Sequence, residues 1–405
     1  MNKLKFSKKS YAILCFILMI ATAVSGQEPY LFTLNPNVLS KNKIAFQQKD
    51  AAIIKKVEIV TKKADSYLGL LPLTVMQKSF TPSSGSKHDY MSLGPYWWPN
   101  PAKPDGLPYI RKDGLRNPEI KKITDRQYLG ELEQRCKFLA LAYYFTGDEK
   151  YATQARTFLN AWFINPETKM NPNLNYGQAI PGLNEGRGIG IIESRLMVDI
   201  LDWVGLLTPS EGFKSNELPK LKSWFNDYLT WLLTSKNGLD EAQSKNNHGT
   251  FYELQVATFA AFVNNDEALN DAFIRLNSRM AEQFQPNGQQ PLELERTNAL
   301  SYSVMNLNGW FALAMLADKF NQDLFHKTTP EGGGLQKSLD WLIPYVFNEQ
   351  EFKFQQIGNF DKNDFYPLLL IANQQYSEPI YQRYIKKYTP DEPNMVMDLL
   401  YKLPN

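Results

Sequence analysis

Apolar residues at helical spacing run through almost the whole of this 405-residue chain. Near the start of the pattern, Ala51, Ile54, Val57, Val60 and Ala64 follow one another at three or four positions. This spacing places them on one face of an α-helix. Since alternating strand patterns are scarce, we expect an all-α fold. Further helices are predicted over about 124–146, 148–164, 187–206, 216–235, 248–264, 266–285, 298–319, 334–347, 363–375 and 377–388.

The predicted helices come in pairs that are joined by short turns. Residues 139–145 run into Thr146-Gly147-Asp148-Glu149, and residues 257–262 run into Asn264-Asn265-Asp266-Glu267. Gly or Asn at a helix end and Asp at the next N-cap are typical of such turns. Helical hairpins without a strict repeat favour an (α/α)n toroid over a solenoid. We expect six to seven hairpins, with the first helix of each pair lining the interior.

Two stretches interrupt the helical pattern. Residues 78–122 and 165–186 are rich in proline, glycine and polar or aromatic residues. Long ordered loops in a compact domain are usually functional. We expect the first to form an aromatic lid loop over one end of the toroid, and residues 27–405 to form a single catalytic domain.

The first 26 residues have the features of a secretory signal peptide. Four lysines between positions 3 and 9 precede an apolar segment over 11–20, and Ala23-Val24-Ser25-Gly26 forms a small-residue cleavage site. The apolar segment is shorter than the roughly 20 residues that a membrane span needs. The alternative is an uncleaved anchor. We expect a secreted, periplasmic protein with no membrane segment after cleavage.

The charge balance and the rare residues exclude several classes of function. Removal of the four lysines leaves 40 basic against 42 acidic residues, whereas nucleic-acid binding requires a basic face. Three isolated histidines do not form a zinc motif, and no phosphate-binding glycine loop is present. Residues 361–364 lack the glycine of a calcium loop and are predicted to cap a helix. We expect a monomer that needs no metal and no cofactor.

Asn246-Asn247-His248 stands directly before a long apolar helix, and Arg296 and Tyr302 flank the start of another. Two inner helices that begin at the same end of a toroid would bring these side chains to one cleft. In the alternative interpretation one Asn is an N-cap, Arg296 forms a surface ion pair and Tyr302 is a packed ring.

Aromatic residues of the first loop could contact a sugar. Tyr96, Trp97 and Trp98 present flat apolar faces that suit the C–H faces of sugar rings, and His88 could add a polar contact. Alternatively, these residues fix the loop to the core.

The second loop leads into the segment Gly186-Arg187-Gly188. Arg187 suits bidentate recognition of a carboxylate, with Tyr176 and Gln178 nearby, and the glycines would allow a close approach to the ligand. The alternative for Arg187 is an ion pair with Glu185 or Glu193.

These residues together carry a resemblance to a known family. The signal peptide, Pro95-Tyr96-Trp97-Trp98-Pro99, Gly186-Arg187-Gly188, Asn246-Asn247-His248 and the later Arg296 and Tyr302 resemble the alginate lyase superfamily of helical-toroid polysaccharide lyases. Polysaccharide lyase family 38 is the nearest, and family 5, whose spacing differs slightly, is more distant. The resemblance implies metal-independent β-elimination on anionic uronate polysaccharides, commonly alginate, with glucuronan as another substrate class.

The expected reaction fits these residue types. Removal of H5 from a 4-linked uronate requires neutralisation of the adjacent carboxylate, for which Asn247 and His248, with Arg296, supply hydrogen bonds and charge. Tyr302 would protonate the leaving O4 and abstract H5 where both lie on one face of the sugar. His248 or another tyrosine would act as base for the opposite epimer. Because the ordinary pKa of tyrosine is about 10, we expect Arg296 to lower that of Tyr302.

Two other functions stay open at this point. A glycoside hydrolase on the same toroid would need two carboxylates across the bond, and Asp89, Glu185 and Glu193 form no evident pair. A non-catalytic surface glycan-binding protein would usually carry a lipid-anchored cysteine after the signal, and none follows it here.

Overall fold

The computed structural model describes residues 30–388 and 395–404, apart from the side chains of residues 214–216. The predicted signal peptide over residues 1–26 lies outside this part of the chain. Among the helices described, none is long and apolar enough to cross a membrane.

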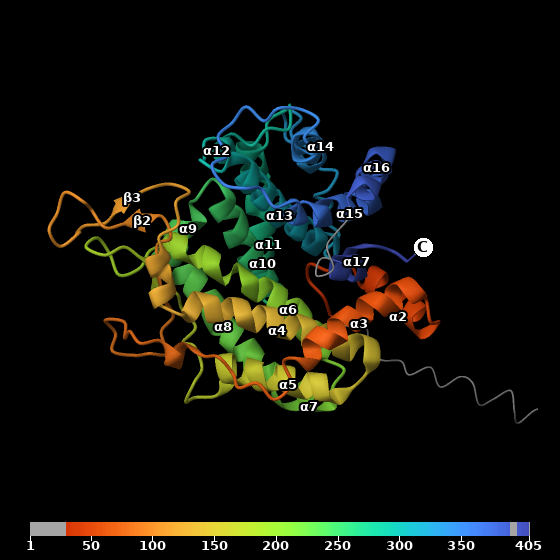
Figure 1. Cartoon of the computed structure of the whole chain (residues 1–405), viewed down its shortest axis with the longest axis horizontal. Coiled ribbons are helices and arrows are strands. Elements are labelled where there is room, and N and C mark those ends of the chain that lie inside the picture. Colours follow the sequence, from red (N-terminus) through yellow and green to blue (C-terminus); the bar gives the residue numbers. More distant parts are fainter. Residues whose placement is uncertain (1–29, 389–394, 405) are drawn as a thin grey trace, which may run out of the picture.

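Five long helices form the inner layer of the molecule (Figure 1). In chain order each packs against the next: α4 (Asp125–Thr146), α6 (Leu196–Leu207), α10 (Asn247–Val263), α13 (Ala299–Asp318) and α15 (Tyr366–Gln375). Most side chains of α10 and α13 are buried on all sides, as expected for helices covered by an outer layer.

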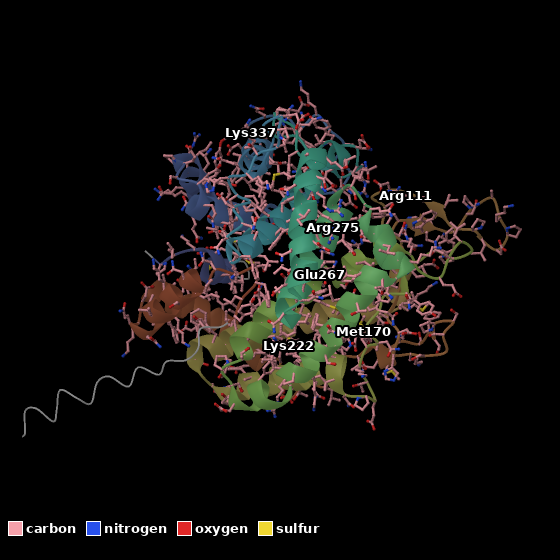
Figure 2. All side chains as sticks on the ribbon, turned by 180° about the vertical axis from the view of Figure 1, so that it is seen from behind. Arg111, Met170, Lys222, Glu267, Arg275 and Lys337 are labelled. Atoms are coloured by element: carbon pink, nitrogen blue, oxygen red, sulfur yellow. The ribbon has the colours of Figure 1, made fainter. Side chains whose placement is uncertain are left out.

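An outer layer covers these helices. α5 packs on α4, α11 on α10, α14 on α13 and α16 on α15, whereas α8 packs on α10 rather than on the inner helix that precedes it. The outer helices are α3 (Ala51–Asp65), α5 (Glu149–Leu159), α8 (Leu218–Thr234), α11 (Asp266–Gln283), α14 (Leu335–Val346) and α16 (Pro379–Lys387). Figure 2 shows α11 from outside, with Glu267 and Arg275 labelled on it.

The two ends of the chain meet and complete the ring. α17 (Val396–Tyr401) contacts α15 on one side and α2 (Pro36–Gln47) and α3 on the other, while α3 packs on α4. One apolar core extends from Leu31 to Leu400. The mostly helical architecture confirms the predicted (α/α) toroid.

The first predicted turn has the expected Asp cap, whereas the second is capped by Asn265 and not by Asp266, which is the first residue of α11 (Asp266–Gln283). Gly147 ends α4 with a φ of +74°, and Asp148 accepts a hydrogen bond from the Lys150 amide at 3.1 Å. Asn264 ends α10 with a φ of +62°, and Asn265 caps α11. Asp361 likewise accepts from the Asn363 amide at 2.9 Å, as predicted for a cap.

The spacing of apolar residues did not predict the short helices and the irregular turns. α7 (Glu211–Asn216), α9 (Lys236–Ala242) and α12 (Pro291–Leu294) are too short to show a repeating pattern. The predicted helix over 187–206 begins as a 3-10 helix, Gly188–Arg195, and the one over 148–164 ends in a π turn, Asn160–Ile164.

Four short strands organise the two long loops. β1 (Met91–Leu93) pairs in parallel with β4 (Tyr176–Ala179), which joins one loop to the other. β2 (Trp97–Trp98) pairs with β3 (Ile110–Arg111) in an antiparallel arm that projects from one end of the toroid, on the left in Figure 1. A fully buried ion pair between Lys78 and Asp125, at 2.9 Å, fixes the start of the first loop to α4.

Candidate active site

Two adjoining cavities lie at the end of the toroid that carries the long loops. The first, of about 620 Å³, is bounded by the starts of α10 and α13 and by both loops, and we call it the arginine cavity. The second, of about 640 Å³, lies between α6, α13, α15 and the loop before α15, and we call it the amide cavity. They share the lining residues Tyr96, Arg116, Arg195, Tyr302 and Met305.

The arginine cavity brings together all four predicted catalytic residues. Asn247, His248, Arg296 and Tyr302 line it. So do five of the predicted binding residues, Tyr96, Trp97, Gln178, Arg187 and Asn246.

Three predicted binding residues line neither cavity and instead hold the loops together. His88 bonds through Nδ1 to the carbonyl oxygen of Lys169 at 2.6 Å, and Trp98 donates to the carbonyl oxygen of Leu115 at 2.9 Å. Tyr176 begins β4 and pairs with Met91 of β1.

The start of α10 positions Asn246 and Asn247 differently. Asn246 is the N-cap, since its side chain accepts from the His248 amide at 3.3 Å. Asn247 is fully buried, and its main-chain N–H and Nδ2 donate to the two oxygens of Glu293 at 2.6 and 2.7 Å. Its Oδ1 has no hydrogen-bond partner. The Asn247 amide is thus held rigidly at the cavity with polar capacity in reserve, since only one of its two Nδ2 hydrogens is engaged.

His248 is oriented by a buried carboxylate. Its Nδ1 lies 2.7 Å from Oε1 of Glu241, a residue of α9 that is 1% exposed. The carboxylate accepts a hydrogen from Nδ1, which leaves Nε2 available for a substrate atom. The approach to α10 is rigid as well, because Arg279 of α11 donates to the carbonyl oxygens of Ala242 and Ser244.

Tyr302 lies in the first turn of α13, and its hydroxyl is 2.7 Å from that of Tyr96. The Arg296 guanidinium stacks on the Tyr302 ring, 3.8 Å from its centre. Burial and the neighbouring Tyr96 raise the pKa of Tyr302 well above its ordinary value, although Arg296 opposes this rise. Arg296 thus lowers the pKa of Tyr302 as expected, but the cost of burying the phenolate is larger, so the net pKa is raised.

Arg296 is held by Asp113 of the first loop. Its Nε and Nη2 donate to the two oxygens of Asp113 at 3.2 and 2.9 Å, and the Thr297 hydroxyl donates to the same carboxylate at 3.1 Å. These bonds hold the pKa of Asp113 well below its usual range. Gly114 makes the approach possible, since a Cβ there would lie 2.4 Å from the Thr297 hydroxyl. Asp113 occupies the edge of the Arg296 guanidinium that could form a bidentate pair. Arg296 therefore interacts with the Tyr302 ring and is not free to bind the carboxylate of a ligand in this way.

Arg187 forms neither of the ion pairs considered as alternatives. Its Nε and Nη2 donate to the main-chain and side-chain oxygens of Gln178 at 3.1 and 3.0 Å, and its guanidinium faces the Trp97 ring. Its charge is therefore not cancelled by a carboxylate, which keeps it available for an anionic ligand.

The glycines beside Arg187 lie close to the neighbouring backbone. A Cβ on Gly186 would lie 1.9 Å from the carbonyl oxygen of Asn175, and one on Gly190 would lie 2.5 Å from the backbone of Gly177. They allow the segment around Arg187 to pack directly on residues 175–177, and the close approach of a ligand at these glycines stays a prediction.

The lining of the arginine cavity is rich in cations, four of which pair with the carboxylates of Asp113, Glu193 and Glu282. Besides Arg187 and Arg296, its lining includes cations that the sequence did not single out: Arg111, Arg116, Arg126, Arg195 and Lys245. The single carboxylate in the lining is that of Glu295. Three of these arginines lie within residues 111–126. The repeated basic residues in and after the first loop could have indicated a cationic lining. Figure 2 shows Arg111 on the projecting arm.

The carboxylates considered for a hydrolase are engaged elsewhere. Asp89 binds Asn171 and Ser84, and Glu185 accepts from Ser83. Glu193 is buried with Tyr90 and Ser92. None of the three lines the arginine cavity. Among the residues that the structure describes, no three His, Cys, Asp or Glu side chains are placed to hold a metal ion.

Comparison with known proteins gives the family. No curated protein matches the chain. An alginate lyase from Bacteroides ovatus of known structure is 37% identical, with a TM-score of 0.88 over 93% of this chain and 100% of the other. An alginate lyase from Sphingomonas species A1 shares the fold at 14% identity, with a TM-score of 0.52 over 92% and 98% of the two chains. The family model for alginate lyases matches residues 74–352. The chain therefore belongs to the alginate lyase family.

Proposed function

We propose that this polysaccharide lyase cleaves 4-linked uronate polymers, with alginate as substrate, by β-elimination. One observation carries the proposal. Tyr302 and the Asn247–His248 pair face a single cavity, and three arginines of its lining, Arg116, Arg187 and Arg195, form no ion pair with the described residues. Such a field attracts a polyanion and stabilises the additional negative charge that develops during proton abstraction. Two of the similar structures support this substrate, since they are named as alginate lyases.

The first chemical requirement is neutralisation of the uronate carboxylate. When H5 leaves, its electron pair is delocalised into that carboxylate as an enediolate. Asn247, through its second Nδ2 hydrogen, and His248, when its Nε2 carries a proton, are the donors that would bind it, and both side chains are fixed by buried carboxylates. Preorganised donors of this kind avoid reorganisation during the reaction. Arg187 supplies charge at the same cavity.

The second requirement is transfer of the H5 proton and cleavage of the C4–O4 bond. The electron pair from C5–H forms a C4–C5 double bond, and O4 leaves with a proton as the hydroxyl of the departing sugar. Tyr302, with its raised pKa, is a neutral phenol near neutral pH and is suited to supply this proton. The Tyr96 hydroxyl, at 2.7 Å, can relay a proton to Tyr302 by donating its own hydrogen and accepting another.

The base depends on the face on which H5 lies. Where H5 and O4 share a face, Tyr302 serves both steps and must first lose its proton, to which the Arg296 guanidinium over its ring contributes. Where they lie on opposite faces, neutral His248 accepts H5 through Nε2 while Tyr302 remains the acid, and the carboxylate is then held by Asn247 and Arg187. Neither path needs a metal ion or a cofactor.

The direct experiment is incubation of the purified protein with polymannuronate, polyguluronate and glucuronan. Elimination produces a 4,5-unsaturated uronate end that absorbs in the ultraviolet, in equal number to new reducing ends. Reducing ends without this absorbance would contradict the lyase proposal and favour a hydrolase. We expect the rate to be unchanged in excess chelator. A loss of activity on chelation would contradict the proposal that no metal ion is needed.

We also propose that the mature enzyme is a secreted, periplasmic monomer. The signal-like segment over residues 1–26 supports export. Cell fractionation with N-terminal sequencing of the mature protein tests localisation and cleavage. Light scattering of the purified protein tests the monomer.

A further inference from the structure

The amide cavity differs from the arginine cavity in its charge. Among the residues that line the amide cavity alone, no lysine or arginine occurs, and the charged types are Asp199 and Asp364. The residues that line the arginine cavity alone include five cations and one carboxylate. Arg116 and Arg195 stand at the junction and belong to both. Of those five cations, four are paired with carboxylates of the described residues: Arg111 and Arg296 with Asp113, Arg126 with Glu193 and Lys245 with Glu282. The amide cavity therefore lacks the unpaired charge of Arg187 and adds two aspartate side chains, so it offers an anion less than the arginine cavity does.

Neutral hydrogen-bonding groups take the place of the cations. Side-chain amides of Asn298, Asn308, Asn359 and Asn363 line the amide cavity, together with Ser301. Several of these groups have polar atoms with no protein partner within the described residues. Asn298 uses its Oδ1 for the Gly358 amide and keeps Nδ2 free, whereas Asn308 uses its Nδ2 and keeps Oδ1 free.

Asp199 adds a further neutral donor. It lies on α6 at the cavity wall and forms no hydrogen bond or ion pair with the described residues. Burial, with the nearby Glu133 and Asp202, raises its pKa to about 8, so the carboxyl is mostly protonated at neutral pH. A protonated carboxyl both donates and accepts, as a sugar hydroxyl does. Phe251, Phe311 and Met315 supply apolar surface in the same wall.

The reaction fixes which sugar would occupy this cavity. The attacked uronate has its carboxylate at Asn247 and His248, which line the arginine cavity and not the amide cavity. Its O4 must lie at Tyr302, which lines both. The sugar that leaves with O4 therefore lies beyond Tyr302.

Resting on the proposed function, we propose that the amide cavity binds the departing sugar through its hydroxyl groups and not through a carboxylate. The enzyme then requires a uronate on the side that is eliminated, and accepts either a uronate or a neutral hexose on the leaving side. Its substrates include polymers in which uronates alternate with neutral sugars.

A partially carboxyl-reduced polymannuronate tests this. In this polymer a known fraction of residues is neutral hexose at random positions. After digestion, the unsaturated end of each fragment comes from the arginine cavity and the reducing end from the amide cavity. Mass spectrometry with a reducing-end label reads both. We expect every unsaturated end to be a uronate, and neutral hexose at reducing ends at about its fraction in the polymer.

The outcomes separate the two proposals. Cleavage of the unreduced polymer with reducing ends that are almost all uronate would overturn this inference and leave the lyase intact. No cleavage of unreduced polymannuronate, polyguluronate or glucuronan would overturn the proposed function, and this inference with it.

A charge change at the rim gives a second test. Asn359 is exposed and has no side-chain hydrogen bond within the described residues, so Asn359→Asp should fold normally. The added charge should raise the ratio of neutral to uronate reducing ends about threefold, the size of an exposed charge interaction. Asn226→Asp makes the same change on the exposed face of α8, outside both cavities, and should leave the ratio unchanged. An unchanged ratio in Asn359→Asp would count against occupation of the amide cavity by the departing sugar.

Discussion

The two halves of the catalytic site are held by different parts of the molecule. Asn247 and His248 are fixed by Glu293 and Glu241, which are 1% exposed and belong to the helical toroid. Tyr302 and Arg296 contact Tyr96 and Asp113, which the long first loop brings to α13. The half proposed to bind the carboxylate is thus part of the scaffold, and the half proposed to transfer the proton is completed by a loop. Changes to the loop should affect proton transfer more than carboxylate binding.

The largest effect is expected from Tyr302→Phe, which removes the only proposed acid that both cavities share. We expect kcat to fall by about 100- to 10,000-fold on every uronate polymer, with KM little changed. The initial rate of ultraviolet absorbance measures this. Tyr345→Phe, outside both cavities, is the control. A rate within tenfold of wild type would exclude Tyr302 as the proton donor.

Removal of the carboxylate behind His248 tests the scaffold half. Glu241→Gln keeps the shape but no longer favours the Nδ1–H form of the imidazole, so kcat should fall by about 10- to 100-fold. Because Glu241→Gln leaves the surroundings of Tyr302 unchanged, the remaining activity should still need Tyr302. Adding Tyr302→Phe to Glu241→Gln should therefore lower kcat further. Glu267→Gln on the outer face of α11 is the matched control (Figure 2). Equal activity of Glu241→Gln and wild type would contradict an orienting role.

Asp113→Asn tests the loop half. It weakens the bidentate pair that holds Arg296 against the Tyr302 ring, and we expect about a tenfold loss of kcat. KM should change less, since Asn247 and His248 remain in place. Asp105→Asn lies in the same loop without contact to either cavity and serves as control. A rise in KM at constant kcat would show instead that Asp113 shapes substrate binding.

The smallest effect concerns stability and pH. The pKa of Asp113 is lower in the folded protein than its ordinary value of 3.8, so its interactions stabilise the fold above about pH 4 and are lost as pH falls below that value. The unfolding free energy of wild type should exceed that of Asp113→Asn by about 1 kcal/mol, constant from pH 5 to 8. Denaturant titrations measure this difference, which should shrink below about pH 4. A difference that grows on acidification would have the wrong sign for this ion pair.

The sequence alone predicted the long helices, the turns between them and the four side chains that the fold brings to the arginine cavity. Repeated spacing over twenty residues and turns such as Gly147-Asp148 encode structure within a few positions of themselves, so they can be read without knowledge of the fold. The rarity of histidine and the resemblance to a known family directed attention to His248, Arg296 and Tyr302.

Only the tertiary structure decided what each of these side chains touches. Arg296 meets Asp113 across 183 positions and Tyr302 meets Tyr96 across 206. No local pattern specifies such pairs. The upward shift in the pKa of Tyr302 also depends on tertiary structure, because it follows from the burial of the ring and not from the neighbouring sequence. The contrast between a cationic and a neutral cavity arises likewise from helices and loops that the toroid brings together.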